Sequence, residues 1–207
     1  MTRLELFKKG FPWSKNEQKE LPNVDVVGEF IRLREKRIDD IPDEYSWRVD
    51  DELSRLDATR PLTMSYDDFF RYTKEEMQFP SYRSKRLAID TLDGVHIGNV
   101  MYYDLNVRNR EAELGIMIGD KGYWGKGYGT DIVKTLLTHL FLDIALDRVY
   151  LHTLAWNYRA QASFEKAGFK KVRSVRRGGQ EFLLMEVVGT EWRNEVGGEV
   201  DDTSRTS

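Results

Sequence analysis

Three glycines at alternate positions, Gly125, Gly127 and Gly129, lie directly ahead of an apolar segment with helical periodicity. Glycine lets the backbone turn tightly and lets a ligand come close to the main chain. The first N–H groups of a helix have no partner inside it, and they point outward at the positive end of the helix dipole. Such a stretch can hold a phosphate, so residues 125–130 are a candidate anion-binding loop.

Two other phosphate-binding motifs do not fit this loop. A P-loop needs G-x-x-x-x-G-K-[ST], but Gly119 lies one residue too far from Gly125, and Gly127 stands where Ser or Thr should be. A dinucleotide-binding fingerprint needs G-x-G-x-x-G, whereas the spacing here is G-x-G-x-G. A glycine-rich turn that binds no ligand remains the alternative interpretation of the loop alone.

The elements that must position this loop alternate between strand and helix patterns. Strands are predicted over residues 26–34, 84–90, 95–105, 111–118, 148–154, 169–176 and 181–188. The first is predicted by its alternating pattern and 148–154 by its β-branched and aromatic content. Helical spacing and capping residues predict two short helices within 38–59 and longer ones over 65–78, 130–144 and 157–167. Asp93-Gly94 favours a hairpin turn, and Gly168 is typical of a helix C-terminus.

The composition is that of an ordinary soluble globular protein and argues against several other classes. The 207 residues are 40% hydrophobic and 32% charged, which suits one domain with a sizeable core. A net charge of -3 and a pI near 5.8 do not favour nucleic acid as a partner. With no Cys and only three scattered His, no metal site is expected. We find no signal-peptide pattern and no apolar run of membrane-spanning length, so we expect a cytoplasmic protein.

Composition also divides the chain into three parts. Residues 1–25 are polar with two prolines and predict an irregular arm. The patterned segment 26–188 is expected to be one domain, with no internal repeat or linker. Residues 189–207 are polar and are expected to form a disordered tail.

A second motif lies about thirty residues after the glycine loop and adds specificity. It has the form N-x-x-A-x-x-x-[YF]-E-[KE]-x-G-F and consists here of Asn157, Ala160, Phe164, Glu165, Lys166, Gly168 and Phe169. Together the two motifs resemble the acetyl-CoA site of the GNAT superfamily of N-acetyltransferases. The opening strand, Trp47 in an acidic two-helix region and the segment 97–99 resemble the branch with ribosomal-protein N-terminal and spermidine acetyltransferases.

This resemblance covers roughly residues 26–188 and implies a fold. The expected class is α+β in three layers, with a GNAT-like mixed, mostly antiparallel central sheet of about seven strands and helices on both faces. It also implies acetyl-CoA as cosubstrate and no metal. A homodimer is compatible with the resemblance, and neither a membrane nor nucleic acid is expected as a partner.

The resemblance assigns the cofactor contacts residue by residue. The loop N–H groups would hold the pyrophosphate, and the peptide-like pantetheine arm would lie along residues 116–118 as an added strand. The family usually has Gln or Arg at Trp124, so Trp there suggests packing or stacking instead of a cationic contact. The implied cofactor-binding residues are Ile116, Met117, Ile118, Trp124, Gly125, Lys126, Gly127, Tyr128, Gly129, Thr130, Asn157 and Phe164. Plain alternatives stay open: a solvated Lys126, a helix N-cap at Asn157 and core packing for the apolar residues.

Acetyl transfer needs a base, because an alkyl ammonium with a pKa of about 10 must lose a proton. Glu113 is the candidate, acting directly or through water, because the family often has an acid at this end of the strand. Glu111 has the same face parity and is the rival, and a surface glutamate is the alternative interpretation. A main-chain N–H in the same strand would stabilise the oxyanion.

The family often uses a tyrosine to protonate the leaving thiolate, and the matching residue here is Phe164. Three outcomes are open: water does it, another tyrosine such as Tyr158 does it, or the chemistry is weak. The expected function is therefore transfer of an acetyl group to a primary amine by direct attack on the thioester. The amine could belong to a protein N-terminus, a polyamine or another small molecule. The alternative is a CoA-binding regulatory or interaction module with little turnover.

The same acidic region offers one hint about the amine. Asp50, Asp51, Glu52, Asp67 and Asp68 could attract a cationic substrate. A solvated helix face is the alternative interpretation of these charges.

Overall fold

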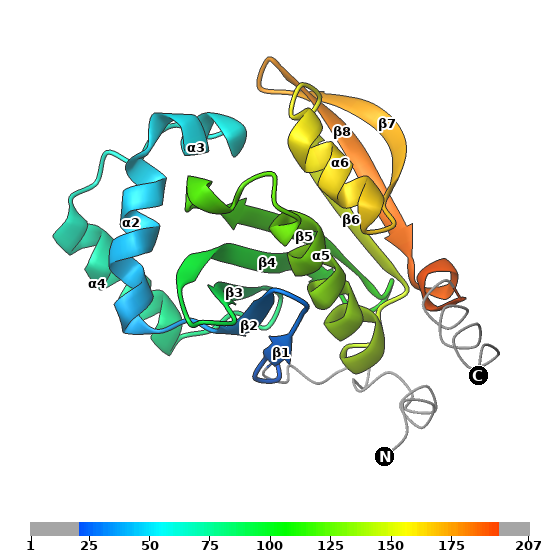
Figure 1. Cartoon of the computed structure of the whole chain (residues 1–207), viewed down its shortest axis with the longest axis horizontal. Coiled ribbons are helices and arrows are strands. Elements are labelled where there is room, and N and C mark those ends of the chain that lie inside the picture. Colours follow the sequence, from blue (N-terminus) through cyan, green and yellow to red (C-terminus); the bar gives the residue numbers. More distant parts are fainter. Residues whose placement is uncertain (1–20, 195–207) are drawn as a thin grey trace.

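The computed structural model describes residues 21–194, which form one eight-stranded sheet with helices packed around it (Figure 1). The strands are β1 (Asp25–Val27), β2 (Ile31–Glu35), β3 (Lys85–Thr91), β4 (His96–Asn106), β5 (Glu111–Ile118), β6 (Arg148–Leu154), β7 (Lys170–Arg177) and β8 (Gln180–Val188). The helices are η1 (Ile38–Asp40), α2 (Ile41–Val49), α3 (Asp51–Leu56), α4 (Tyr66–Gln78), η2 (Lys121–Tyr123), α5 (Tyr128–Thr138), its π-helical continuation η3 (His139–Asp143) and α6 (Tyr158–Lys166). The strand order is β1-β2-β3-β4-β5-β6-β8-β7, and within residues 21–194 only β5 and β6 pair in parallel.

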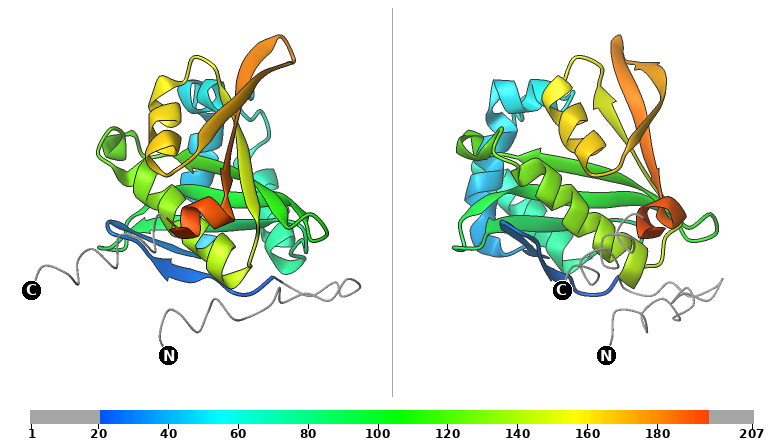
Figure 2. Two further views of the ribbon diagram at one scale, coloured as in Figure 1. Left: turned by 90° about the vertical axis from the view of Figure 1, so that its right-hand side faces the viewer. Right: turned by 45° about the vertical axis from the view of Figure 1, so that its right-hand side comes forward.

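Helices cover both faces of this sheet, as expected. Ile31 and Leu33 of β2 belong to the main core together with Leu136 on the apolar stripe of α5. Arg34, which points to the opposite face, contacts Asp40 of η1 instead. Helices α5 and α6 lie side by side on the first face, and η1 leads into α2 on the second (Figure 2). The α+β class and the mostly antiparallel sheet are confirmed.

The first predicted strand is wrong in one respect: residues 26–34 form a hairpin of two strands, so the sheet has eight strands instead of seven. The chain turns at Gly28, whose N–H donates to Ile31 O at 2.7 Å. The turn is held from outside by Asp131 in the first turn of α5. Its carboxylate accepts the N–H groups of Glu29 and Phe30 at 3.0 and 2.8 Å.

We expect Asp131→Ala to lower the free energy of unfolding by about 1–2 kcal/mol, since it removes two hydrogen bonds to a charged acceptor. It also removes an acid from the N-terminal turn of a helix. Denaturant unfolding would measure the effect, with Lys134→Ala, exposed one turn further along α5, as the control. Equal stability of the two variants would contradict this account of the turn.

The boundaries of the domain extend slightly beyond the predicted 26–188. Leu21 and Val24, assigned to an irregular arm, are buried in the main core. Residues 189–194, assigned to a disordered tail, are helical, and Trp192 packs on Phe141 with ring centroids 5.3 Å apart. The rest of the predicted arm and tail, residues 1–20 and 195–207, lies outside the described residues.

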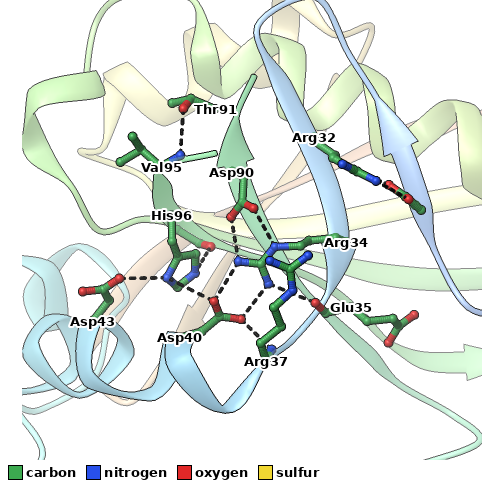
Figure 3. A network of polar contacts seen from close by, with 12 residues as sticks. Arg32, Arg34, Glu35, Arg37, Asp40, Asp43, Asp90, Thr91, Val95 and His96 are labelled. Atoms are coloured by element: carbon green, nitrogen blue, oxygen red, sulfur yellow. Dashed lines mark hydrogen bonds and ion pairs between the residues drawn. The ribbon is translucent and has the colours of Figure 1, made fainter. Parts of the chain in front are cut away.

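Arg34 is the centre of a buried polar network (Figure 3). Its guanidinium donates to Asp90 at 2.6 and 2.8 Å and to Asp40 at 2.7 Å in two places. Burial alone would raise the pKa of Asp40, but hydrogen bonds led by those from Arg34 lower it below 3.8. The network therefore stabilises the fold above that pH, and this contribution is lost as pH falls through the lowered pKa.

Trp47 of α2 packs against the residue that follows β5. A Cβ at Gly119 would lie 1.9 Å from Trp47 Cδ2, so the indole occupies the space that any larger residue would need. The ring of His96 in β4 lies 4.9 Å from the indole, and Ile97 O accepts the N–H of Gly119. Helix α2 is thereby held where β5 leads into the glycine loop.

Candidate functional site

The parallel strands β5 and β6 pair only briefly and then separate. β5 and β6 share three residue pairs, from Glu111–Arg148 to Glu113–Tyr150. Beyond Glu113, β5 continues to Ile118 without a β6 partner. A cleft of about 310 Å³ opens there, bounded by β5, the glycine loop and α6, with Leu53 and Leu56 of α3 at its rim.

The alternation of hydrogen bonds shows which backbone groups of β5 point into this cleft. Gly119 N–H donates to Ile97 O on the β4 side, so odd-numbered residues of β5 face β4. At the other end Arg148 N–H donates to Arg110 O, which places even-numbered residues toward β6. Ile116 and Ile118 therefore direct their main-chain groups into the cleft. Met117 directs its main-chain groups to β4, although its side chain lines the cleft.

The glycine loop has the conformation that its sequence suggests. Gly125 and Gly127 have φ values of 71° and 92°, a region that strains other residues. α5 begins at Tyr128, so the helix N-terminus points at the cleft mouth. Thr130 N–H already donates to Gly127 O at 3.0 Å, which leaves the earlier N–H groups for an anion. Gly129 serves packing as well, because a Cβ there would lie 3.1 Å from Ser163 Oγ of α6.

The side chains of the loop residues differ in where they lie. Trp124 lines the cleft, donates from Nε1 to Ile118 O at 2.8 Å and stacks on Arg159, whose Cζ is 3.7 Å from the ring centroid. Burial lowers the pKa of Arg159. Lys126 is exposed, and Tyr128 packs against Phe30 outside the cleft lining. Trp124 therefore acts by packing and through one main-chain bond.

The second motif supplies the opposite wall. Asn157 lines the cleft and also caps α6, since its Oδ1 accepts Ala160 N–H at 3.2 Å. Phe164 is 6% exposed, lines the cleft and packs on Phe169 with centroids 5.9 Å apart. Tyr158 is 74% exposed and is not part of the cleft lining, so its hydroxyl lies away from this wall.

Glu113 is the last residue of β5 that pairs with β6, and it is not among the residues that line the cleft. It is only 8% exposed, and its Oε1 is 2.8 Å from His152 Nδ1. Burial, followed by the charge of Glu113 and a hydrogen bond to it, raises the pKa of Tyr103. Burial and the same carboxylate raise the pKa of Tyr150. A buried carboxylate surrounded by two tyrosines and a histidine is suited to moving a proton.

Glu111, the rival carboxylate, lies in a different setting. It accepts from Arg148 Nη1 at 2.7 Å, and Arg148 also donates to Glu186 at 2.7 Å. This ion-pair group lies at the paired end of β5 and β6, away from the cleft. The structure therefore distinguishes the surroundings of Glu111 from those of Glu113, which their shared face of the strand could not do.

The acidic residues that could attract a cationic substrate are mostly engaged in other contacts. Asp50 caps α3, and both Asp50 and Glu52 lie within 3.0 Å of Lys121 Nζ. Asp68 interacts with Ser65 at the start of α4 and pairs with Arg71. These contacts support the solvated-face interpretation for three of the five acids.

Sequence reasoning missed Tyr103, His152 and the α3 leucines. Tyr103 could have been found, because a hairpin between the predicted strands 95–105 and 111–118 places it opposite Glu113. His152 required the parallel pairing of β5 with β6, which no local pattern shows. In the part of the chain that the structure describes, no group of three or more His, Asp or Glu could hold a metal ion. None of the helices in residues 21–194 is long and apolar enough to cross a bilayer.

Known proteins resemble this chain in sequence. A family model described as an acetyltransferase (GNAT) domain matches residues 31–170. The putative ribosomal N-acetyltransferase YdaF of Bacillus subtilis (strain 168) is 33% identical over 86 residues, 42% of this chain and 46% of the relative. The probable spermine N(1)-acetyltransferase of Bacillus subtilis subsp. natto is 28% identical over 100 residues, 46% of this chain and 66% of the relative. The chain thus spans less than half the length of the first relative.

Solved structures share the architecture at low identity. The spermidine N-acetyltransferase from Vibrio cholerae, in complex with CoA and spermine, has a TM-score of 0.70 and 19% identity. The match covers 79% of this chain and 98% of that one. A GNAT-family acetyltransferase from Bacillus anthracis has a TM-score of 0.69 at 14% identity, covering 81% and 99%. At these identities the likeness shows a common fold.

Proposed function

The chain belongs to the GNAT acetyltransferase family, and on that premise we propose that it transfers the acetyl group of acetyl-CoA to a primary amine by direct attack on the thioester. One observation carries the proposal. The glycine loop and the unpaired backbone of β5 line one cleft, and the buried carboxylate of Glu113 lies on the same strand, where its pairing with β6 ends.

Each part of the cleft suits a part of the cofactor. The loop N–H groups of residues 125–129 and the α5 N-terminus suit the pyrophosphate. The main-chain groups of Ile116 and the N–H of Ile118 suit the amides of the pantetheine arm, which would lie beside β5 as a strand, whereas Ile118 O already accepts from Trp124 Nε1. Phe164 offers an apolar wall to that arm. A β5 N–H on the cleft side would stabilise the oxyanion that develops on the thioester carbonyl.

The proton of the attacking amine goes to Glu113, directly or through one water. Glu113 shares its face of β5 with Gly115 and Met117, the face opposite to α5. The amine would therefore approach through the separation of the strands from the side away from α5 and α6. The amine nitrogen adds to the thioester carbonyl to give a tetrahedral intermediate. The C–S bond breaks as this intermediate collapses, and the thiolate takes a proton from water in the absence of a tyrosine at position 164.

Polyamines are the first acceptors to test, because one relative is named for spermine and one structural neighbour holds it. A protein N-terminus is the second acceptor to test, because the other relative is named a putative ribosomal N-acetyltransferase. A homodimer and a cytoplasmic location stay predictions. Light scattering on the purified chain would test the homodimer.

The experiment is a coupled thiol-release assay with an amine panel of spermidine, spermine, an N-terminal peptide and an amino sugar. We expect release that depends on one amine class. The alternative, a CoA-binding module, predicts stabilisation by acetyl-CoA with no thiol released for any amine.

We expect Gly127→Val to abolish the thermal shift that acetyl-CoA causes, because a branched side chain at a φ of 92° would reshape the phosphate loop. Gly94→Val is the matched control. Gly94 has a φ of 85° in the β3–β4 turn and open space around it, so it carries the same backbone strain far from the cleft. An unchanged shift in Gly127→Val, with normal circular dichroism, would remove the loop from the cofactor site.

A further inference from the structure

His152 lies between Glu113 and Arg177 where β5 and β6 begin to separate. Its Nδ1 is 2.8 Å from Glu113 Oε1, and its Nε2 is 3.1 Å from Arg177 Nη2. The side chains of His152 and Glu113 are 12% and 11% exposed. The three residues come from β6, β5 and β7, so this chain of contacts joins the two halves of the sheet.

The contacts of the two ring nitrogens favour one tautomer of His152. A guanidinium has only N–H donors, so the Nε2 that faces Arg177 must accept. A neutral imidazole with an accepting Nε2 carries its hydrogen on Nδ1, and that hydrogen points at Glu113. Arg177 therefore selects the tautomer in which His152 donates to the carboxylate.

Glu113 needs such a partner because it projects from a strand at the point where its neighbour turns away. A glutamate has three side-chain torsions, and a base misplaced by about 1 Å can cost about a hundredfold in rate. His152 anchors one carboxylate oxygen from the far side of the gap. A carboxylate has about four acceptor positions, so room remains for the amine proton.

We propose that His152 and Arg177 are positioning residues for Glu113: Arg177 fixes the tautomer of His152, and His152 holds the carboxylate toward the acceptor amine. This inference rests on the proposed function. Neither residue needs to touch either substrate, and their effect passes through Glu113.

Kinetics of four single variants test the proposal. His152→Leu removes the donor and should lower kcat about ten- to a hundredfold, with the KM for acetyl-CoA unchanged. His152→Asn places an amide N–H near the Nδ1 position and should recover most of the loss. Arg177→Met should lower kcat by less than His152→Leu does. Arg176→Met is the control, since Arg176 is exposed on the opposite face of β7 and should behave as wild type.

A double-mutant cycle tests whether His152 acts through Glu113. In a Glu113→Gln background, His152→Leu should have almost no further effect on kcat. Independent, multiplicative effects would overturn the proposal, as would failure of His152→Asn to recover activity while it folds and binds acetyl-CoA normally.

Nitrogen NMR of the histidine rings gives a readout that does not need turnover. We expect the Nδ1–H tautomer for His152 in the full wild-type chain and a mixture of tautomers in Arg177→Met. An Nε2–H tautomer in the wild type would overturn the inference even if the chain is an active acetyltransferase. The expected tautomer without thiol release for any amine would instead count against the proposed function.

Discussion

Replacing Glu113 with Gln should lower kcat by about 10²- to 10³-fold while the Kd for acetyl-CoA stays within about threefold. The change keeps the size of the side chain and removes the proton acceptor, and a general base is typically worth about 10²–10⁴-fold. What remains would depend on amine that is already deprotonated. Because an alkyl ammonium has a pKa of about 10, the residual rate should rise steeply with pH up to that range.

Glu111→Gln is the matched control, two residues away on the same face of β5. The substitution weakens the ion pair between residue 111 and Arg148, but Arg148 still pairs with Glu186. We therefore expect a small change in stability and little change in kcat. Steady-state kinetics across pH and calorimetric titration with acetyl-CoA would measure both variants. If Glu113→Gln kept the wild-type rate and pH profile, Glu113 would be structural and the base would lie elsewhere.

Phe164→Tyr should raise kcat, by on the order of a hundredfold if breakdown of the intermediate limits turnover. The added phenol would lie on the cleft wall where the family often has a tyrosine, and a positioned acid typically contributes this much. The ring is already packed on Phe169, so the change should keep the packing. Single-turnover kinetics would show whether the chemical step is the one accelerated.

Phe169→Tyr is the control for a hydroxyl added to the same aromatic pair. Phe169 is 2% exposed and does not line the cleft, so its variant should lose roughly 1–3 kcal/mol of stability and gain no rate. If a crystal structure of Phe164→Tyr placed the hydroxyl near the thioester sulfur and kcat did not rise, the missing acid would not be what limits turnover. A smaller gain would mean that water already protonates the thiolate efficiently.

Most elements of this fold follow from local patterns. The glycine loop, the α5 stripe, the Asn157 cap of α6 and the Gly168 end of that helix were predictable, because each depends on residues within one or two turns of chain. The β1–β2 turn was not. Its N–H groups are held by Asp131, about a hundred residues later, and residues 26–34 alone look like one continuous strand.

The candidate site also combines residues that local sequence predicts with residues that only strand pairing brings together. Residues on the loop and on α6 could be found from sequence, because the motifs are contiguous. The environment of Glu113 could not, since His152 and Arg177 reach it only through the pairing of β5 with β6 and of β8 with its neighbours. Local pattern likewise could not tell Glu111 from Glu113. Both residues pair with β6, and they differ because Glu113 is the last pair before the two strands separate.

The three-pair junction between β5 and β6 leaves one edge of β5 without a strand, at the place where a ligand is expected to lie. A ligand that fills this edge completes the hydrogen bonding of the sheet, and it binds only the folded chain. By mass action, a ligand at a hundred times its Kd adds about 2.7 kcal/mol to the stability of such a protein. The steady-state abundance of this protein in a cell should therefore follow the supply of acetyl-CoA, because unliganded chains expose a strand edge to proteases and to aggregation.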